Sequence, residues 1–529
     1  MKRSARVVAA VCAAVVVGVA GCTSTVVPSA EEHPITAPTP ALQKLYDQRV
    51  TWESCQGNDI VNKVAGDGMS NRFTCATVTV PVNYDNPDGE QISLQLVRYS
   101  RDNDNPPLIY NPGGPGGSAV QSLPGMVRGV FSDRLLGSYD IVAVDPRGVG
   151  TSSPLNCRSA AEIDHDRSQP AIPIDTPPND IISQLQEDSA AMGKKCLAAN
   201  EGLTTYMDTV SAARDLDVIR AALGQDTLNY FGFSYGTFLG ATYLDMFGKN
   251  AGRFVLDGAL DPSIGIEEVA AGQAAGFEAS LGHWIEMNFD DPEFPFNVER
   301  DVDRSKAALK QWVDGLDADP LPTSDPNRTV GTAVAWSAIM SQMYSLVNYT
   351  NATTAVKLGY TLRDGSMLLQ IADLYADRES DGTYATNASD AFTVVNALDY
   401  PLTTTPEEWA RDAEKLVNDY PTVGENFAYS AAAVAAWPVK SRATREAVHG
   451  EDAGPVLVIG THHDPATPYP WAQSLASQLK SATLVSWNGW DHCAYRIGGS
   501  QCVVRIVDDY FINGTVPEEG AASSCPSTE

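Results

Sequence analysis

Short apolar runs and stretches with a helical period alternate along most of the chain. The first two runs, at 77–82 and 92–97, are rich in β-branched residues and flank the turn Pro87-Asp88-Gly89, which predicts a β-hairpin. Later apolar runs end at turns that contain Gly or Asp, and they fall at 107–110, 141–144, 228–233 and 254–256. Helical windows between and after these runs include 210–223 and 237–247. Alternating buried strands and helices predict a doubly wound, mostly parallel α/β sheet.

The middle of the chain has a different pattern. From about residue 262 to 450 the strand signal fades and helical windows such as 332–346 and 407–419 dominate, before strand-like runs return at 455–459 and 482–486. We therefore expect one sheet formed by residues 45–262 and 451–529, with residues 263–450 inserted as a mostly helical domain. Sites in such sheets collect at the carboxyl ends of the parallel strands.

The N-terminal residues have the three-part layout of a secretory signal. A basic start is followed by an apolar run at 7–19, too short for a permanent membrane-spanning helix, and then by Val19-Ala20-Gly21-Cys22. Val-Ala-Gly-Cys resembles the lipobox of bacterial lipoproteins, in which the cysteine receives lipid and becomes the mature N-terminus. We expect residues 1–21 to be a signal peptide and Cys22 to carry the lipid. The alternative is a plain cleaved signal whose cysteine is incidental.

This interpretation places the protein outside the cytoplasm, anchored by lipid on the outer face of the cell membrane. Residues 22–44 are expected to be a flexible linker, because the segment 23–42 is rich in Pro, Ser and Thr and has no apolar period. The net charge of −30 repels phosphate backbones and anionic lipid, so nucleic acid is not an expected partner and charge alone would not hold the protein on a membrane. No pattern indicates an oligomeric state.

Cysteine usage follows from the predicted export, because cysteines pair in an oxidising compartment. Without Cys12 in the leader and the lipidated Cys22, seven cysteines remain. Nearest-neighbour pairing predicts three bridges and leaves Cys493 unpaired: Cys55–Cys75, Cys157–Cys196 and Cys502–Cys525. A bridge from Cys493 to Cys502 is the main alternative.

The pentapeptide Gly232-Phe233-Ser234-Tyr235-Gly236 is the strongest chemical signal in the chain. It follows an apolar strand and precedes a helical window, which is the setting of the nucleophile elbow in an α/β-hydrolase fold. The two glycines are needed because side chains do not fit beside the strained serine. The sequence therefore predicts Ser234 as a nucleophile.

A serine hydroxyl is a poor nucleophile until a histidine takes its proton and a carboxylate fixes the imidazole tautomer. In this fold the partners follow the serine in the order Asp, His, near the ends of the last strands. Asp464 lies just beyond the strand predicted at 455–459, and His492 lies just beyond the strand predicted at 482–486. We therefore expect a catalytic triad of Ser234, Asp464 and His492.

Neighbouring residues offer alternatives. His462 and His463 directly precede Asp464, but adjacent residues of an extended segment point to opposite sides and no third ligand is close in sequence, so we expect neither a metal nor a cofactor. Asp491 could replace Asp464 as the acid, but it adjoins the histidine in sequence and is poorly placed to reach its ring. Cys493 is expected to be an inert neighbour or a bridge partner.

The transition state also needs donors for an oxyanion. The loop Asn111-Pro112-Gly113-Gly114-Pro115-Gly116-Gly117-Ser118 follows the strand at 107–110, and its glycines let the main chain approach a substrate. We expect the hole to be formed by Gly113, Gly114 and the amide of Tyr235. The loop that begins at Asp145 follows the next strand, and we expect Asp145 and Arg147 to support the glycine loop.

Together these segments resemble the exported tripeptidyl-aminopeptidase-like α/β-hydrolases of actinobacteria, which are related to prolyl iminopeptidases and include mycobacterial envelope lipoproteins. The matching segments cover the core, at 77–81, 83–87, 113–116, 145–148, 232–236, 256–258 and the loops of Asp464 and His492. Two positions depart from the pattern. Prolyl iminopeptidases carry His before Gly-Gly-Pro-Gly, where this chain has Pro112, and Cys493 stands where Gly is more usual.

The resemblance implies a helical lid over the active site and hydrolysis of peptides near a free N-terminus, through an acyl-enzyme. Carboxylates in the lid would then hold the substrate ammonium; Asp290, Asp291 and Glu293 are candidates, although a solvated turn is the simpler interpretation. Residues spaced as Trp336, Met340 and Tyr344 are more typical of lid core than of a substrate wall. The alternative function is a carboxylesterase or lipase on envelope lipids or acyl esters. A solute-binding lipoprotein would need neither the elbow nor the triad.

Overall fold

The computed structural model describes residues 39–55, 72–101, 105–170, 172–173, 176–496, 499–517 and 525–526. The predicted signal peptide, Cys22 and most of the predicted linker lie outside these residues. The first helix, α1 (Pro40–Tyr46), begins inside the range expected to be linker.

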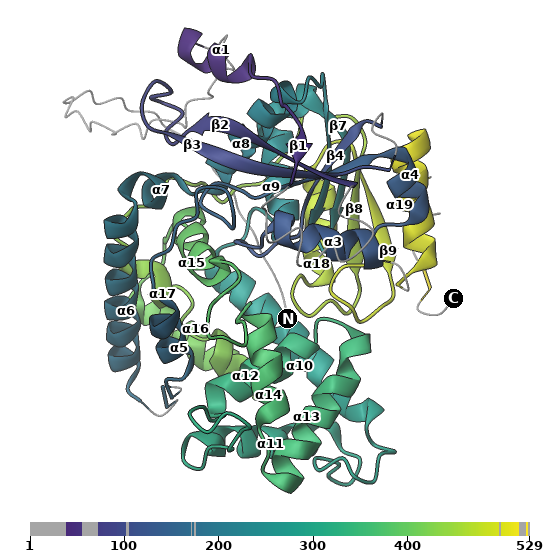
Figure 1. The fold of residues 1–529 in the computed structure, drawn as a ribbon. Coiled ribbons are helices and arrows are strands. Elements are labelled where there is room, and N and C mark those ends of the chain that lie inside the picture. Colours follow the sequence, from purple (N-terminus) through teal and green to yellow (C-terminus); the bar gives the residue numbers. More distant parts are fainter. Residues whose placement is uncertain are drawn as a thin grey trace, which may run out of the picture. The chain divides into compact units, whose positions relative to one another are not determined.

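A sheet of nine strands runs through the part of the chain that the structure describes, in the order β1-β2-β3-β5-β4-β6-β7-β8-β9 (Figure 1). The strands are β1 (Glu53–Ser54), β2 (Phe73–Pro81), β3 (Gln91–Tyr99), β4 (Pro107–Asn111), β5 (Asp140–Val144), β6 (Leu228–Phe233), β7 (Ala251–Asp257), β8 (Val456–Thr461) and β9 (Ala482–Trp487). Pairing is antiparallel from β1 to β5 along the sheet and parallel from β5 to β9. The expected hairpin is β2 and β3, and the predicted mostly parallel α/β sheet is confirmed.

Both faces of this sheet are covered by helices, because its parallel strands carry apolar residues at successive positions. Every residue of β5 and β8 is buried. One face packs against α8 (Thr209–Ala222), α9 (Tyr235–Phe247) and α18 (Tyr469–Gln478). The opposite face packs against α3 (Ala119–Gly129), α4 (Asp133–Ser138) and α19 (Gln501–Asn513). The helical windows at 210–223 and 237–247 correspond to α8 and α9.

The chain between β7 and β8, residues 258–455, is called the helical insertion here (Figure 1). Its α-helices are α10 (Ile266–Met287), α11 (Val302–Asp314), α12 (Thr332–Gln342), α13 (Tyr349–Leu362), α14 (Ser366–Tyr375), α15 (Ala388–Asp399), α16 (Pro406–Asp419) and α17 (Ala432–Ala435). It has an apolar core of its own that includes Phe277, Trp284 and Ile339. The window predicted at 332–346 is shorter in the structure, because the chain leaves α12 after Gln342 to contact the sheet domain.

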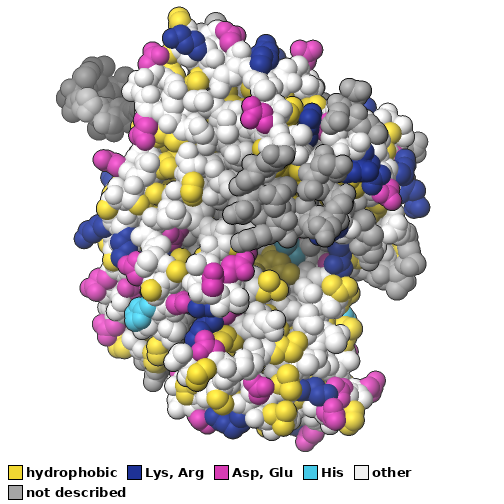
Figure 2. All heavy atoms as spheres, viewed as in Figure 1, with side chains coloured by type: hydrophobic (Ala, Val, Ile, Leu, Met, Phe, Trp, Pro, Cys, Tyr) yellow, Lys and Arg dark blue, Asp and Glu magenta, His cyan; other side chains and the backbone are white. Residues whose placement is uncertain are grey.

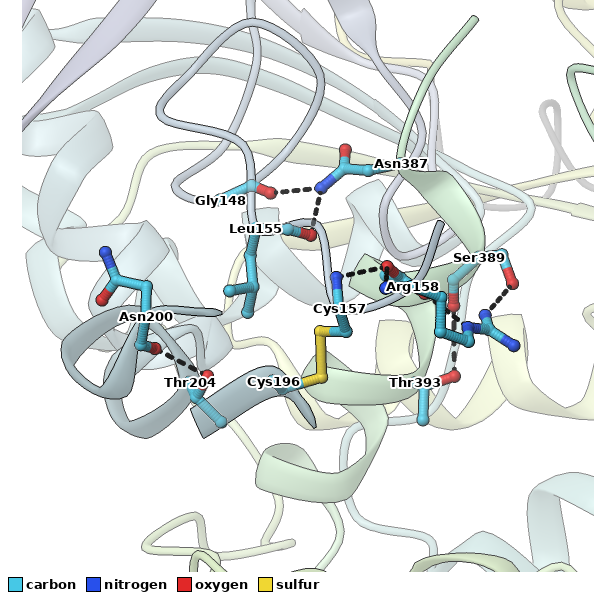
Figure 3. Close-up of a disulfide and its surroundings, with 11 residues drawn as sticks. Gly148, Leu155, Cys157, Arg158, Cys196, Asn200, Thr204, Asn387, Ser389 and Thr393 are labelled. Atoms are coloured by element: carbon cyan, nitrogen blue, oxygen red, sulfur yellow. Dashed lines mark hydrogen bonds and ion pairs between the residues drawn. A yellow bond between two sulfur atoms is a disulfide. The ribbon is translucent and has the colours of Figure 1, made fainter. Parts of the chain in front are cut away.

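Three more helices adjoin the insertion: α5 (Ala160–Arg167), α6 (Pro178–Ala199) and α7 (Glu201–Tyr206). They fall in the range expected to belong to the core, yet α6 packs against α16 and α17, and Ile182 shares a buried cluster with Trp409. A disulfide from Cys157 to Cys196 joins α6 to the loop after β5 (Figure 3). The helices next to the sheet domain therefore come from two parts of the chain, the helical insertion and the segment from α5 to α7.

The structure contains the bridges Cys55–Cys75, Cys157–Cys196 and Cys502–Cys525, and Cys493 has a free thiol. Within the described residues no helix is long and apolar enough to cross a membrane. On the face drawn in Figure 2, acidic side chains are spread among basic and apolar ones instead of gathering in one region.

Candidate active site

Ser234 stands in the sharp turn between β6 and α9. Its backbone has φ 55° and ψ −124°, a conformation that residues with a side chain rarely adopt. A Cβ atom at Gly232 would lie 2.3 Å from the carbonyl oxygen of Gly236, and one at Gly236 would lie 2.8 Å from the carbonyl oxygen of Asn111. The turn therefore requires both glycines of the pentapeptide, and it presents the serine at the carboxyl end of β6.

His492 and Asp464 form a direct hydrogen-bonded pair. The imidazole Nδ1 lies 2.9 Å and 3.0 Å from the two carboxylate oxygens. Asp464 also accepts hydrogen bonds from the amides of Ala466 and Thr467, at 2.9 Å and 2.8 Å. Because the carboxylate is buried and fixed in this way, it orients the ring and leaves Nε2 as the nitrogen that can take a proton.

The electrostatic surroundings make His492 a stronger base. Burial lowers the pKa of this imidazole. The charge and hydrogen bond of Asp464 and the charge of Asp257 raise the pKa, and together they outweigh burial, so that the pKa of His492 lies above its usual value. A base with a pKa near the working pH accepts a serine proton efficiently.

Ser234 and His492 both lie next to the end of β7. The Ser234 amide donates to the carbonyl oxygen of Asp257 at 2.9 Å, and a Cβ atom at the next residue, Gly258, would lie 3.2 Å from Cε1 of His492. Among the hydrogen bonds of the described residues, none joins the Ser234 hydroxyl to the imidazole. In unliganded enzymes such bonds are often long and tighten when substrate binds. The structure thus brings the three residues together, with the Asp464–His492 pair already formed.

The glycine loop after β4 lies against the nucleophile. A Cβ atom at Gly113 would lie 2.8 Å from Cβ of Ser234 and 3.3 Å from the amide nitrogen of Tyr235. However, the Gly113 amide donates to Oδ1 of Asn111 at 2.9 Å, so it does not serve as the expected oxyanion donor. The amides of Gly114 and Tyr235 have no acceptor in the part of the chain that the structure describes. These two amides fit the expected oxyanion hole.

The two residues expected to support this loop behave differently. Asp145 accepts hydrogen bonds from the Ser118 hydroxyl at 2.8 Å and the Val120 amide at 3.0 Å, which fixes the end of the glycine loop. Arg147 does not reach the loop, because its guanidinium is paired with the buried carboxylate of Asp215 at 2.6 Å and 2.8 Å. Only Asp145 therefore has the expected contact.

The alternatives around the triad have other partners. Asp491 accepts hydrogen bonds from Ser345, Leu346 and Arg496, and none from His492. His463 stacks on the ring of Trp490 with centroids 4.0 Å apart, and His462 packs beside Tyr469. Across the described residues, no three side chains suited to binding a metal come together.

The carboxylates considered for amine binding are paired at the surface. Asp290 pairs with Arg300 at 2.6 Å, whereas Asp291 and Glu293 pair with Lys357 at 3.1 Å and 2.8 Å. These surface ion pairs agree with the simpler interpretation of the segment, a solvated turn.

The aromatic residues of α12 and its C-terminal extension divide between two roles. Trp336 is buried in the core of the insertion. Tyr344 lies edge-on to His492, with ring centroids 5.3 Å apart. Of the two, Tyr344 is therefore the one that borders the catalytic groups.

Comparison with known proteins identifies the family of this chain. A family profile described as TAP-like protein matches residues 420–524, which contain both Asp464 and His492. Carboxylesterase B of Mycobacterium tuberculosis is 34% identical over 505 residues, or 92% of each chain, and serine protease Hip1 of the same species is 30% identical over 494 residues, or 90% of this chain and 91% of Hip1. The chain belongs to the TAP-like family of α/β-hydrolases.

A third relative and a solved structure are also similar to this TAP-like hydrolase. The tripeptidyl aminopeptidase of Streptomyces lividans is 29% identical over 486 residues, covering 88% of this chain and 84% of that enzyme. Among solved structures, the proline iminopeptidase of Mycobacterium smegmatis is 14% identical, with a TM-score of 0.36 and coverage of 83% of this chain and 98% of that one. With its elbow, acid–base pair and oxyanion loop, the TAP-like hydrolase is a serine hydrolase.

One residue of the TAP-like hydrolase site was not predicted. Asp257 accepts hydrogen bonds from the amides of Ala494 and Tyr495, at 3.0 Å and 2.7 Å. Burial raises the pKa of Asp257 to about 6, the charge of Asp464 adds to the rise, and the backbone hydrogen bonds and His492 oppose it. A sequence signal existed, because Asp257 directly follows the strand predicted at 254–256 and lies in the matching segment 256–258.

Proposed function

We propose that this hydrolase is an exported serine peptidase that cleaves peptides, or exposed N-terminal segments of envelope proteins, through an acyl-enzyme intermediate. The observation that carries the proposal is the buried Asp464–His492 pair beside Ser234 in its strained elbow. The names of two relatives, serine protease Hip1 and tripeptidyl aminopeptidase, favour a peptide substrate.

The arrangement supports a two-step reaction. Oγ of Ser234 attacks the substrate carbonyl carbon while Nε2 of His492 takes its proton, and the imidazolium is stabilised by Asp464. The amides of Gly114 and Tyr235 donate to the oxyanion. His492 then gives the proton to the leaving amine. In the second step the imidazole takes a proton from water, whose oxygen attacks the ester carbonyl. The bond from the acyl carbon to Oγ breaks, His492 returns the proton to Oγ, and the acid is released.

We further propose that residues 263–450 act as a lid that supplies an apolar border to the site. Tyr375 is exposed and lies 6.2 Å from Tyr344, centroid to centroid, on the side of the base. Phe392 is exposed on α15, whose backbone lies next to Gly116 of the oxyanion loop. An apolar border on both sides suits bulky apolar groups next to the scissile bond.

The same border favours a second function, hydrolysis of carboxylic esters, because acyl chains bind apolar surfaces. The relative named carboxylesterase B, at 34% identity, points the same way. A side-by-side assay of free-amine peptides, N-blocked peptides and acyl esters of several lengths separates the two functions. We expect peptides with a free amine to be the best substrates. Turnover of long-chain esters far above every peptide would contradict the peptidase proposal.

Ser234→Ala is the control for both functions. Its turnover is expected to fall by about 10⁶-fold, as in knockouts of other triads. A fluorophosphonate probe, which reacts with activated serines, should label the native protein and not this variant. Equal labelling of the two proteins would contradict the assignment of Ser234.

For the N-terminus, we propose cleavage of residues 1–21 and lipid attachment at Cys22, with residues 22–44 as the linker. The leader pattern supports this proposal, and the three disulfides suit an oxidising compartment. Cys22→Ala should release the protein from the membrane fraction after a high-salt wash. If all of the variant stays with the membranes, the lipid anchor is wrong.

A further inference from the structure

The loop that carries His492, called the base loop here, contacts the helical insertion through three consecutive residues: Trp490, Asp491 and His492. The Trp490 ring is stacked between His283 of α10 and His463 of the sheet domain, with centroid distances of 3.9 Å and 4.0 Å. These contacts place one aromatic ring of the base loop between the two parts of the protein.

Asp491 makes the most specific of these contacts. Its Oδ1 accepts a hydrogen bond from the Ser345 hydroxyl and another, at 2.9 Å, from the Leu346 amide. Arg496 donates to both Asp491 and Ser345, each at 2.8 Å, which closes a ring of hydrogen bonds. The Asp491 side chain is only 4% exposed, so this carboxylate is shielded from water, and the hydrogen bonds that it accepts are stronger than they would be at the surface.

The same segment of the insertion holds the base itself. The backbone carbonyl of Tyr344 accepts a hydrogen bond from the His492 amide at 2.8 Å, and its ring lies against the imidazole. Asp464 fixes the direction of Nδ1 and accepts the Cys493 amide at 3.2 Å, and Asp257 accepts the next two amides, so the backbone after the base is held at the ends of the strands. The backbone of His492 itself is held by Tyr344, and Asp491 just before it is held by Ser345 and Leu346, in the stretch where the chain has left α12.

From this geometry we propose that Asp491 is a positioning residue for the catalytic base, which it holds in place by tying the base loop to Tyr344–Leu346. Docking of the insertion and assembly of the Asp464–His492 pair with Ser234 are then one event. The inference rests on the proposed triad, and it holds whether the substrate is a peptide or an ester.

The test compares Asp491→Ala with Asp491→Asn and Ser345→Ala in the full-length protein. Its main readout is the second-order rate at which a fluorophosphonate labels Ser234, supported by kcat and KM on the best substrate. Asp491→Ala should lower the labelling rate and kcat by about 10²-fold, because a displacement near 1 Å of a catalytic group costs that much. KM should change little. Asp491→Asn, which keeps an acceptor oxygen for Leu346, should lose less.

Ser345→Ala and Asp491→Ala should also be non-additive, because both remove members of one network. Additive losses in labelling rate would overturn the proposal, since they would mean that the two residues act separately.

Glu278 provides a matched control for loss of stability. It is a buried carboxylate of α10 that likewise binds a cation, a hydroxyl and backbone amides, through Lys306, Thr422 and Val423. Glu278→Ala should lower Tm and leave labelling at 25 °C unchanged. Labelling of Asp491→Ala at the native rate, or equal losses of labelling in both variants, would overturn the positioning role. A native protein that resists the probe would overturn the triad as well.

Discussion

The main-chain amide of Ser234 donates a hydrogen bond to the carbonyl oxygen of Asp257 across 2.9 Å. The side chain of the same aspartate accepts the amides of Ala494 and Tyr495, two and three residues after the base. One residue at the end of β7 is therefore bonded both to the nucleophile's turn and to the loop of His492. This double attachment sets the separation between the serine and its base.

Asp257→Asn separates the charge of this residue from its shape. An amide oxygen can still accept the two backbone hydrogen bonds, but the charge that raises the pKa of His492 is gone. Without the Asp257 charge, the imidazole should then protonate at lower pH. Because activity is lost when the base is protonated, the acid limb of kcat/KM should move to lower pH. An acid limb that stays in place or moves upward would contradict the electrostatic role of Asp257.

The sheet could be predicted, and a triad could be proposed, because their signals are local. The strand before Ser234, the two glycines beside it and the order of Asp464 and His492 all appear within short windows. The contacts that hold His492 could not be predicted in this way. Ser345 and Asp491 are 146 residues apart, and nothing in either neighbourhood indicates the other.

The oxyanion loop shows the same limit at shorter range. The glycines of the loop after β4 indicate a close backbone approach. Which of their amides is available to an oxyanion, however, depends on the rotamer of Asn111, whose side-chain oxygen accepts the hydrogen bond of the Gly113 amide. Likewise, the helical period of α6 predicts a helix with an apolar face, but it does not predict that this face packs on α16 and α17, because an apolar face can pack on any other apolar surface.

Gly113→Ala should abolish most activity. Its φ of +101° is strained for alanine, and a Cβ atom would lie 2.7 Å from the carbonyl oxygen of Phe233 and 2.8 Å from Cβ of Ser234. We expect a loss in kcat of about 10²-fold or more, since the nucleophile is displaced. Gly125→Ala is the matched control, because a Cβ atom there has nothing within 4 Å and lies in α3. It should stabilise the protein by about 0.5–1 kcal/mol and keep full activity. Equal activity of the two variants, measured beside their melting curves, would contradict this account.

Asp399→Asn should stabilise the protein at alkaline pH. Asp399, at the end of α15, accepts the amide and hydroxyl of Thr209, at 2.9 Å and 2.6 Å. Burial raises the pKa of Asp399 to about 7, the charge of Asp208 adds to the rise, and the Thr209 bonds and Arg445 oppose it. The folded protein therefore binds more protons than the unfolded chain between about pH 4 and 7, and stability falls as pH rises through that window.

Asparagine removes this penalty and keeps an acceptor for Thr209. The Tm of Asp399→Asn should exceed the native value at pH 8 by about 2–4 °C, and the difference should shrink toward pH 4. Thermal melts across this pH range provide the measurement. A variant that is less stable than the native protein at pH 8 would show that the ionised carboxylate contributes stability.

Removing the bridge between Cys157 and Cys196 should reduce stability much more than activity. The bridge closes a sequence separation of 39, and replacing both cysteines with alanine should cost about 4 kcal/mol of unfolding free energy. The loop after β5 has a second attachment, however, because the Asn387 side chain donates to the carbonyl oxygens of Gly148 and Leu155 at 2.8 Å each (Figure 3).

This second attachment comes from the start of α15 and includes Asp390, which accepts the Cys157 amide at 2.6 Å. Since it remains when the bridge is removed, the loop should keep its native position at 25 °C and kcat should stay within about twofold, as expected when a disulfide acts mainly on the unfolded chain. Asn387→Ala should do the opposite, with a smaller loss of stability and a larger loss of kcat, because Asp145 of this loop also holds the oxyanion loop through Ser118. Denaturant unfolding and kcat, measured on both variants, test which attachment positions the loop. A tenfold drop in kcat in the folded double cysteine variant would mean that the bridge, and not α15, positions the loop.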